Sequence, residues 1–397
     1  MTRSTIGVLG GTRDATVDDT GVVSPRASGW DLHWWIGAED RWHVPAREAA
    51  VRQALVDGMP VVQTSMRVPG GDAVQRVYGA PVGDVGEVAV VEISNESPAP
   101  FVAALVVRGA AALDLEGATV HADGRSAIRT SRPPSRWAAA VDGSTEETVT
   151  SGAASDGPFP HRQDRGARLV AAFLYPVAHR TALRAVVSIS TQGIGATEPG
   201  ALPDAAAVAR GWQAQLDRGL RVELPDEQLQ RAVESARAST VLAGQAWRVE
   251  PAVATVLEDW GLDAEAAVAW SRLTGRARRK LRRREPARAT WSDALAHVAS
   301  PDPQLLAAVR AVLVQERDAG VVLVDDWPRE WVGAPIDVRD APTRRGRVSC
   351  SVRWHGERPA LLWEGPVDTT FTAPGLDPGW SSSNAQGEAL LAPFAAR

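Results

Sequence analysis

The chain has 397 residues, of which 44% are hydrophobic and 23% are charged, and its formal net charge is -5. This length predicts two or three domains, and the composition is that of a globular protein rather than a disordered or fibrous one. The mild negative charge gives no overall electrostatic reason to expect binding to nucleic acid or to an anionic membrane.

Several features bear on the compartment and on cofactors. Residues 1–11 contain one Arg and no apolar run that could form the core of a secretory signal, and no later run reaches the length of a membrane span. The single cysteine, Cys350, excludes an intrachain disulfide. The seven His show no pair at metal-ligand spacing. We therefore expect a cytoplasmic protein with no membrane partner, no metal and no other cofactor.

The first half of the chain has the pattern of strands and turns. From Gly29 to about Val222, short apolar runs are separated by Gly, Pro, Asn and Asp. The runs 88–94 and 101–108 flank a segment with two prolines, which predicts a hairpin. Residues 46–56 predict a short helix, and the Ser- and Gly-rich residues 142–164 predict an exposed loop.

At Pro225 the apolar period changes to that of a helix. One helical face is defined by residues three and four apart, namely Leu229, Val233, Ala236 and Thr240. Asp226 is the predicted N-cap of this helix, and a second helix is predicted to stop at Gly261. Thr290 with Asp293 has capping-box spacing, and Asp302 precedes a first-turn proline.

After Gly320 strand-like runs return, so the predicted fold class is α+β and mainly β. We expect three domains. They are a large antiparallel β-sandwich at residues 1–222, a block of four or five helices at 223–320, and a C-terminal β-rich domain at 321–397.

Four segments resemble parts of the six-hairpin, or (α/α)-barrel, glycosidases. Residues 29–43 hold four Trp among charged residues and resemble the opening strands of the β-sandwich that precedes the barrel. Residues 67–76 are similar to the Gly-Asp turn of that sandwich, and residues 256–267 to a barrel repeat in which Gly separates paired helices. Residues 321–333 look like the exit into a C-terminal β domain. The resemblance implies a supersandwich-like first domain and carbohydrate-related function.

The helical block is shorter than the resemblance implies. A complete toroid has about twelve helices, and at roughly 11 residues each these need more chain than residues 223–320 supply. The block therefore resembles a truncated toroid, and no catalytic position is transferred. Two hypotheses follow: a glycoside hydrolase with its cleft between the sandwich and the helices, or a non-catalytic scaffold that binds a saccharide or a protein.

Hydrolysis of a glycosidic bond needs two carboxyl groups at a defined separation. Candidates next to the helical block and its exit are Glu258, Asp259, Asp326 and Glu330. Carboxylates also cap helices or lie in solvent, which explains each of these positions without any catalysis.

Aromatic residues beside charged ones suggest a saccharide-binding surface, because a Trp plane stacks on a pyranose while charged groups reach its hydroxyls. The candidates are Trp34, Trp35, Asp40, Arg41, Trp42 and His43, and in a second cluster Trp354, His355 and Arg358. An uninterrupted strand would place Trp34 and Trp42 on one face and Trp35 on the other, so at least one of the three belongs to the core.

The expected partners are a saccharide, or a protein or second copy of the chain that covers the short helical block. The basic run at residues 276–284 could attract phosphate or an acidic partner. A solvated helix end explains the run more simply, and no aromatic residues accompany it, so nucleic acid is not an expected partner.

Overall fold

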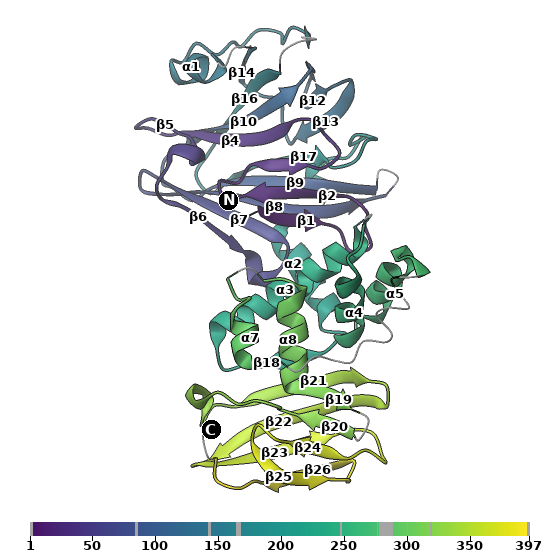
Figure 1. Cartoon of the computed structure of the whole chain (residues 1–397). Coiled ribbons are helices and arrows are strands. Elements are labelled where there is room, and N and C mark those ends of the chain that lie inside the picture. Colours follow the sequence, from purple (N-terminus) through teal and green to yellow (C-terminus); the bar gives the residue numbers. More distant parts are fainter. Residues whose placement is uncertain are drawn as a thin grey trace. The chain divides into compact units, whose positions relative to one another are not determined.

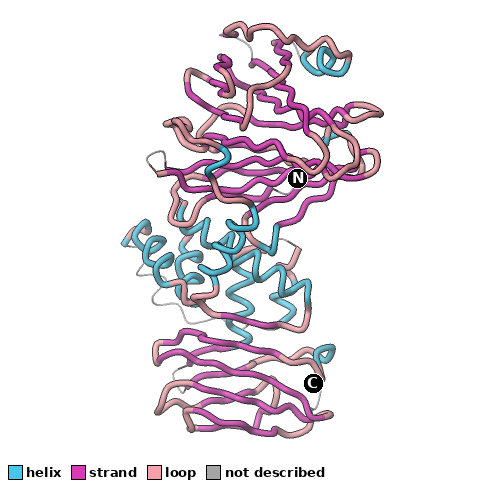
Figure 2. The backbone as a smooth tube through the Cα atoms, turned by 180° about the vertical axis from the view of Figure 1, so that it is seen from behind, coloured by secondary structure: helices cyan, strands magenta, loops and turns pink. Residues whose placement is uncertain are grey.

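The computed structural model describes residues 3–83, 86–141, 144–163, 168–246, 248–275, 277, 289–299, 301–317 and 320–394. The structure is mostly β, with 42% strand and 23% helix, and its several antiparallel sheets confirm the predicted α+β, mainly β class (Figure 2). Two compact units are present, an N-terminal unit (Met1–Gly211) and a C-terminal unit (Trp212–Arg397). Helix α2 (Ala205–Leu216) spans the division between them. The division into three domains, with boundaries at residues 222 and 320, stays a prediction.

The N-terminal unit is built on two antiparallel sheets (Figure 1). The eight-stranded sheet has the order β1 (Arg3–Gly7), β2 (Asp14–Asp18), β3 (Val23–Pro25), β4 (Asp31–Gly37), β10 (Phe101–Ala110), β16 (Leu169–Val177) and β14 (Arg136–Ala140), with β5 (Trp42–His43) beside β4. The nine-stranded sheet has the order β15 (Arg162–Gln163), β11 (Ala112–Glu116), β12 (Thr119–Ala122), β13 (Arg125–Thr130), β17 (Ala182–Ser188), β9 (Gly86–Asn95), β8 (Gly71–Val82), β7 (Val61–Val68) and β6 (Val51–Leu55). Short helical elements connect these strands: η1 (Pro45–Arg47), η2 (Val56–Gly58), α1 (Thr145–Thr150) and η3 (Pro199–Ala201).

One hydrophobic core lies between the two sheets. Trp34 and Leu105 of the first sheet and Val77 and Val91 of the second belong to the same cluster of buried side chains. Alternation along each strand turns these residues toward the facing sheet. The predicted β-sandwich is therefore present in this unit.

The C-terminal unit combines helices with two smaller sheets. Its described helices are α3 (Glu227–Gln245), α4 (Pro251–Asp259), α5 (Asp263–Arg272), α7 (Trp291–Leu295), α8 (Pro303–Leu313) and η4 (Arg329–Trp331). The five-stranded sheet has the order β18 (Arg221–Glu223), β21 (Ile336–Thr343), β22 (Gly346–His355), β23 (Arg358–Glu364) and β26 (Gln386–Leu390). The four-stranded sheet has the order β19 (Val314–Arg317), β20 (Gly320–Leu323), β24 (Phe371–Ala373) and β25 (Asp377–Ser382). Side chains of the helices and of both sheets share one core, as Leu229, Leu361 and Phe371 illustrate.

The predicted helix starts are confirmed where they depend on caps. The Asp226 carboxylate accepts a hydrogen bond from Leu229 N at 2.8 Å, as an N-cap does. Thr290 and Asp293 form the predicted capping box, and Asp302 caps α8 before its first-turn proline. Local side-chain chemistry thus fixes these helix boundaries.

The predicted hairpin between residues 88–94 and 101–108 is wrong, although both segments are strands. Strand β9 pairs with β8 and β17 in the nine-stranded sheet, whereas β10 pairs with β4 and β16 in the other sheet. The chain crosses between the sheets at Asn95, whose buried amide donates to Ala99 O at 2.9 Å and Val177 O at 3.0 Å. The Asn95 side chain thus supplies hydrogen-bond donors to backbone carbonyls where the chain changes sheets, in place of the backbone hydrogen bonds that a hairpin would form.

Two further local predictions need correction. Residues 46–56 do not form a continuous helix, because strand β6 at the sheet edge separates the short helical turns η1 and η2. In β6, half-buried and exposed residues alternate, which is the period of a strand.

Part of the predicted loop at 142–164 is helix α1, where buried Val149 packs on the eight-stranded sheet and Thr145 Oγ1 donates to Val170 O at 2.9 Å. The basic run at 276–284 lies, apart from Ala277, outside the described residues.

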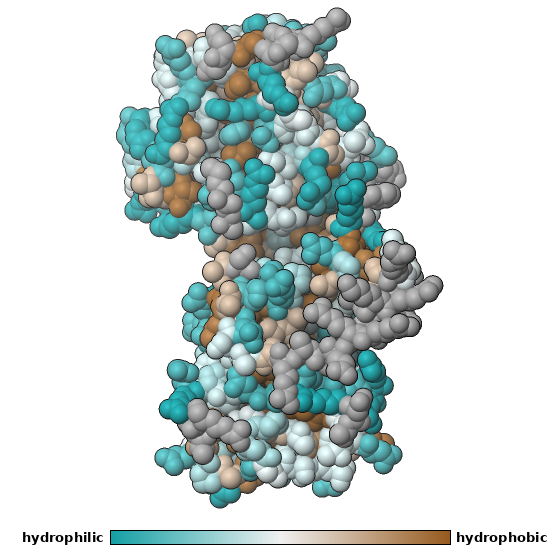
Figure 3. All heavy atoms as spheres, viewed as in Figure 1, coloured by the Kyte–Doolittle hydropathy of each residue, from teal (hydrophilic) through white to brown (hydrophobic). Residues whose placement is uncertain are grey.

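The surface drawn in Figure 3 is mainly hydrophilic, with scattered hydrophobic residues between charged and polar ones. Scattered apolar side chains of this kind are normal for a folded domain. None of the described helices combines the length and apolar character that a membrane-spanning helix needs. Over the same part of the chain, no three His, Cys, Asp or Glu side chains are grouped so that they could hold a metal ion.

Candidate functional site

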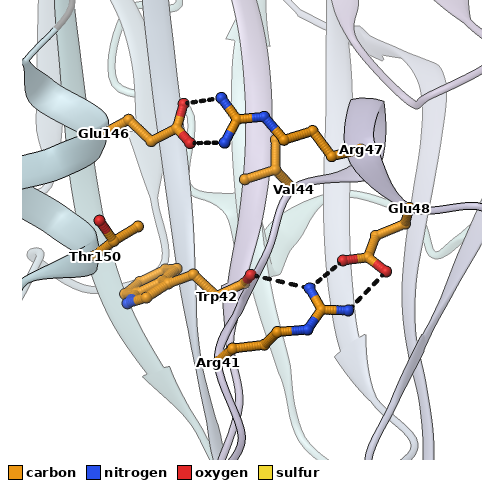
Figure 4. Close-up of a pocket in the computed structure, with 7 residues that line it drawn as sticks. All are labelled: Arg41, Trp42, Val44, Arg47, Glu48, Glu146 and Thr150. Carbon is orange, nitrogen blue, oxygen red and sulfur yellow. Dashed lines mark hydrogen bonds and ion pairs between the residues drawn. The ribbon is translucent and has the colours of Figure 1, made fainter.

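A pocket of about 360 Å³ opens on the outer side of the eight-stranded sheet in the N-terminal unit (Figure 4). Its walls come from β5, η1 and α1, three short elements that lie against that sheet. The residues that line the pocket are Arg41, Trp42, Val44, Arg47, Glu48, Glu146 and Thr150. Arg41 and Trp42 are among the saccharide-binding candidates predicted from sequence.

Trp42 reaches the pocket because the chain reverses after β4. Ala38 N donates to Arg41 O at 3.0 Å, and this turn pairs Trp42 with Gly37 across the two strands. A Cβ at Gly37 would lie 2.9 Å from the Trp42 ring, so the glycine leaves room for the indole to pack over the strand. The indole is half-buried and keeps part of its surface available.

Two Arg–Glu pairs span the polar wall of the pocket. The Arg41 guanidinium donates to both carboxylate oxygens of Glu48, at 2.5 and 3.0 Å. Arg47 makes the same two-bond contact with Glu146, which lies 99 positions further along the chain. Such fork-to-fork bonds fix both partners in orientation as well as in distance. The second pair joins η1 to α1 across the pocket.

His43 lies beneath the first pair and contacts two carboxylates. Its ring is almost fully buried, with Nε2 3.0 Å from Asp40 Oδ1 and Nδ1 3.2 Å from Glu48 Oε1. Hydrogen bonding from Arg41 lowers the pKa of Glu48, and hydrogen bonding to His43 lowers the pKa of Asp40. Both carboxyl groups are therefore held in the ionised form at neutral pH.

Trp34 and Trp35 are core residues, each 1% exposed. Trp34 points into the core between the sheets, and its Nε1 donates to Thr20 O at 3.0 Å. Trp35 points to the other side of β4, into a small cluster against which Trp42 and Val44 pack. A saccharide has no access to either buried indole, so the structure assigns both to packing. The turn at residues 38–41 also corrects the expected alternation, since Trp42 shares a face with Trp35 and not with Trp34.

The second predicted binding cluster lies in the C-terminal unit and is joined to the segment around Glu330. Half-buried Trp354 packs against Trp327 with ring centroids 5.5 Å apart, and Trp327 in turn contacts Trp331. His355 and Arg358 are exposed at the turn between β22 and β23, where Arg358 donates to Leu391 O at 2.9 Å. Trp354 therefore belongs to an aromatic cluster, and His355 and Arg358 lie at the exposed tip of the hairpin next to it.

The predicted catalytic carboxylates have separate structural contacts. Glu258 accepts from Trp270 Nε1 at 3.0 Å, and Asp326 accepts from Trp291 N at 3.1 Å at the start of α7. Glu330 is exposed on η4. Desolvation by the surrounding protein raises the pKa of the Asp259 carboxyl to about 6, although the residue remains exposed to solvent. A raised pKa is the direction that a general acid requires.

The raised pKa of Asp259 predicts that stability falls as pH rises from about 4 to about 6, because the native state keeps a proton that the unfolded chain has already lost. Asp259→Asn, which is neutral throughout, is expected to be more stable than the wild type at pH 7 by about 1 kcal/mol, a value reduced for solvent access. The two proteins should have similar stability near pH 4. Urea midpoints at both pH values check this.

The control for this substitution is Glu357→Gln, in an exposed turn position of the same unit. It should change the midpoint equally at both pH values. An Asp259→Asn difference that does not depend on pH would contradict the expectation and remove the case for a proton at this carboxyl.

Most of the residues that line the pocket were not among the binding candidates predicted from the sequence. Arg47 and Glu48 lie in the segment predicted as a helix, and Glu146 and Thr150 in the segment predicted as a loop. Glu146 and Glu147 near the start of α1 are a weak helix-start signal, since acidic residues favour a helix N-terminus. No local pattern connects Glu146 to Arg47.

Comparison with known proteins adds no relative to these observations. No protein-family model matches the chain, and no curated protein matches it. The pocket itself therefore provides the evidence on function.

Proposed function

We propose that the chain binds a saccharide in the pocket of its N-terminal β-sandwich. The observation that carries the proposal is a Trp next to paired donors and acceptors: the half-buried Trp42 lines the same pocket as Arg41, Glu48, Arg47 and Glu146. A Trp face provides apolar area for the C–H side of a pyranose. The ionic groups and the Thr150 hydroxyl provide hydrogen-bond donors and acceptors for its hydroxyls.

Binding without hydrolysis is the better-supported form of this proposal. Hydrolysis needs one carboxyl that is protonated and one that is ionised. Both carboxylates of the pocket accept two hydrogen bonds from an Arg, and the pKa of Glu48 is lowered rather than raised. A guanidinium in this position stabilises the ionised form, which opposes proton donation to a leaving group.

The similarity to six-hairpin glycosidases remains part of the proposal. The order of most elements is compatible with it: a two-sheet unit comes first, and helices α3 to α8 precede all strands of the two smaller sheets except β18. We propose that the chain is a reduced relative of that group that retained a saccharide-binding sandwich.

Substitution of Trp42 tests the binding proposal. Trp42→Ala is expected to weaken binding to a saccharide found on a glycan panel by about tenfold or more, because a central aromatic contact commonly contributes well over 1 kcal/mol. Isothermal titration with the panel's best ligand measures the loss. The matched control is Trp270→Ala, another half-buried Trp whose indole donates to a Glu carboxylate outside this pocket.

Each outcome is informative. Equal weakening by both substitutions would point to a general loss of structure, and no binding by the intact protein to any glycan would contradict the proposal. Release of reducing ends from the bound glycan would instead support the hydrolase hypothesis.

A further inference from the structure

The charges that line the pocket cancel within closed pairs. Arg41 and Arg47 provide two guanidinium groups, and Glu48 and Glu146 provide two carboxylates. Each cation has an anion in a two-bond contact, and Asp40 lies 3.9 Å from Arg41 as well, so the charge of both guanidinium groups is already balanced. The polar wall is therefore rich in hydrogen-bonding groups and balanced in charge.

This arrangement treats neutral and acidic ligands differently. A guanidinium has five N–H donors and each carboxylate about four acceptor positions, so every pair keeps free donors and acceptors next to each other. Of two vicinal hydroxyls on a sugar, one can accept a hydrogen bond from the guanidinium and the other can donate one to the carboxylate of the same pair. A ligand carboxylate has no proton to donate to the fixed carboxylate of each pair and is repelled by its charge, so it can contact the remaining guanidinium N–H groups only against that repulsion.

We propose that the pocket selects neutral saccharides and rejects uronic acids, and that the Arg47–Glu146 pair sets this selectivity. The inference rests on the proposed saccharide-binding function and specifies its ligand class. Arg47 is the more exposed of the two cations, with 69% of its side chain accessible, so its guanidinium becomes available to a ligand once Glu146 loses its charge.

The experiment compares the wild type with Glu146→Gln, using cellotetraose, mannotetraose and chitotetraose as neutral probes and tetragalacturonate as the anionic probe. The wild type should bind at least one neutral probe and bind tetragalacturonate at least about tenfold more weakly. Glu146→Gln should gain about tenfold or more in affinity for tetragalacturonate, because Arg47 can then form a charge-assisted contact with the ligand. Added salt should reduce that gain.

The matched control is Asp14→Asn, because the Arg26–Asp14 pair has nearly the same exposure, 70% and 20%, as Arg47–Glu146, at 69% and 21%, and lies outside the pocket lining. It should leave both affinities unchanged. Glu48→Gln is the second variant. It removes the two-bond partner of Arg41 but leaves Asp40 3.9 Å from that guanidinium, so it should also gain tetragalacturonate binding, by less than Glu146→Gln does.

The results separate this inference from the proposed function. If the wild type binds tetragalacturonate as tightly as its best neutral probe, or if neither Gln variant gains affinity for it, the selectivity proposal is overturned while saccharide binding stands. If the wild type binds none of the four probes and nothing on the glycan panel, both proposals fail.

Discussion

Trp34→Ala is expected to lower the free energy of unfolding of the N-terminal unit by about 3–5 kcal/mol. Trp34 is 1% exposed, lies in the core between the two sheets, and donates its indole N–H to Thr20 O. Removal of the ring leaves a cavity and a carbonyl without its donor, and both effects lower stability. Chemical denaturation, with the transition of this unit followed by far-UV circular dichroism, measures the loss.

Trp34→Phe is the first control, because it keeps most of the buried volume and loses only the hydrogen bond and part of the ring. It should cost clearly less than the Ala substitution. Trp42→Ala is the second control, since this half-buried Trp packs against the edge of a smaller cluster and its removal should cost less still. A cost below about 1 kcal/mol for Trp34→Ala, together with loss of saccharide binding, would restore Trp34 as a ligand contact.

The contrast between Trp34 and Trp42 shows what the sequence determines about the site. Local alternation correctly separates Trp34 from Trp35, which occupy the two sides of β4. The position of Trp42 depends on a turn of four residues whose backbone hydrogen bond brings β5 beside β4. The spacing of apolar residues does not reveal such a turn, so it cannot predict on which face of the sheet the residues after the turn lie.

Pairing over long distances is the main part of the fold that the sequence could not supply. The helix starts at Asp226, Thr290 and Asp302 depend on contacts within three residues, and these were predicted correctly. The sheet to which β9 and β10 each belong depends instead on strands far along the chain, such as β17 and β16. Buried runs of similar composition can pair with many partners, so a short connection suggested a hairpin.

The same limit applies to the pocket. Arg41 and Trp42 stand in a charged aromatic run and could be selected for their chemistry. Glu146 becomes part of the site only because α1 packs on the outer side of the eight-stranded sheet, through Val149 and Thr145. The contact with Arg47 is a product of the folded topology, and neither residue has a local feature that signals it.

Arg310→Met is expected to destabilise the C-terminal unit by about 3 kcal/mol. Arg310 is 8% exposed, and its guanidinium donates to two backbone carbonyls, Asp259 O at the end of α4 and Pro342 O on β21. Burial lowers the pKa of Arg310, and the nearby negative charge of Asp259 opposes that change. Methionine fills a similar volume but leaves both carbonyls without this donor at a part-buried site, where water replaces the lost bonds less well than at an exposed one.

Arg358→Met is the matched control, because Arg358 also donates to two backbone carbonyls, Leu391 O and Leu390 O, but is exposed. Leu390 is exposed, so water can solvate its carbonyl after the substitution, and the expected cost is below about 1 kcal/mol. Urea unfolding of the two variants under the same conditions gives the difference. Equal costs would contradict the argument, because they would show that burial of the guanidinium adds nothing to its two hydrogen bonds. A larger cost for Arg310→Met would identify that side chain as a polar link between the helices and the five-stranded sheet.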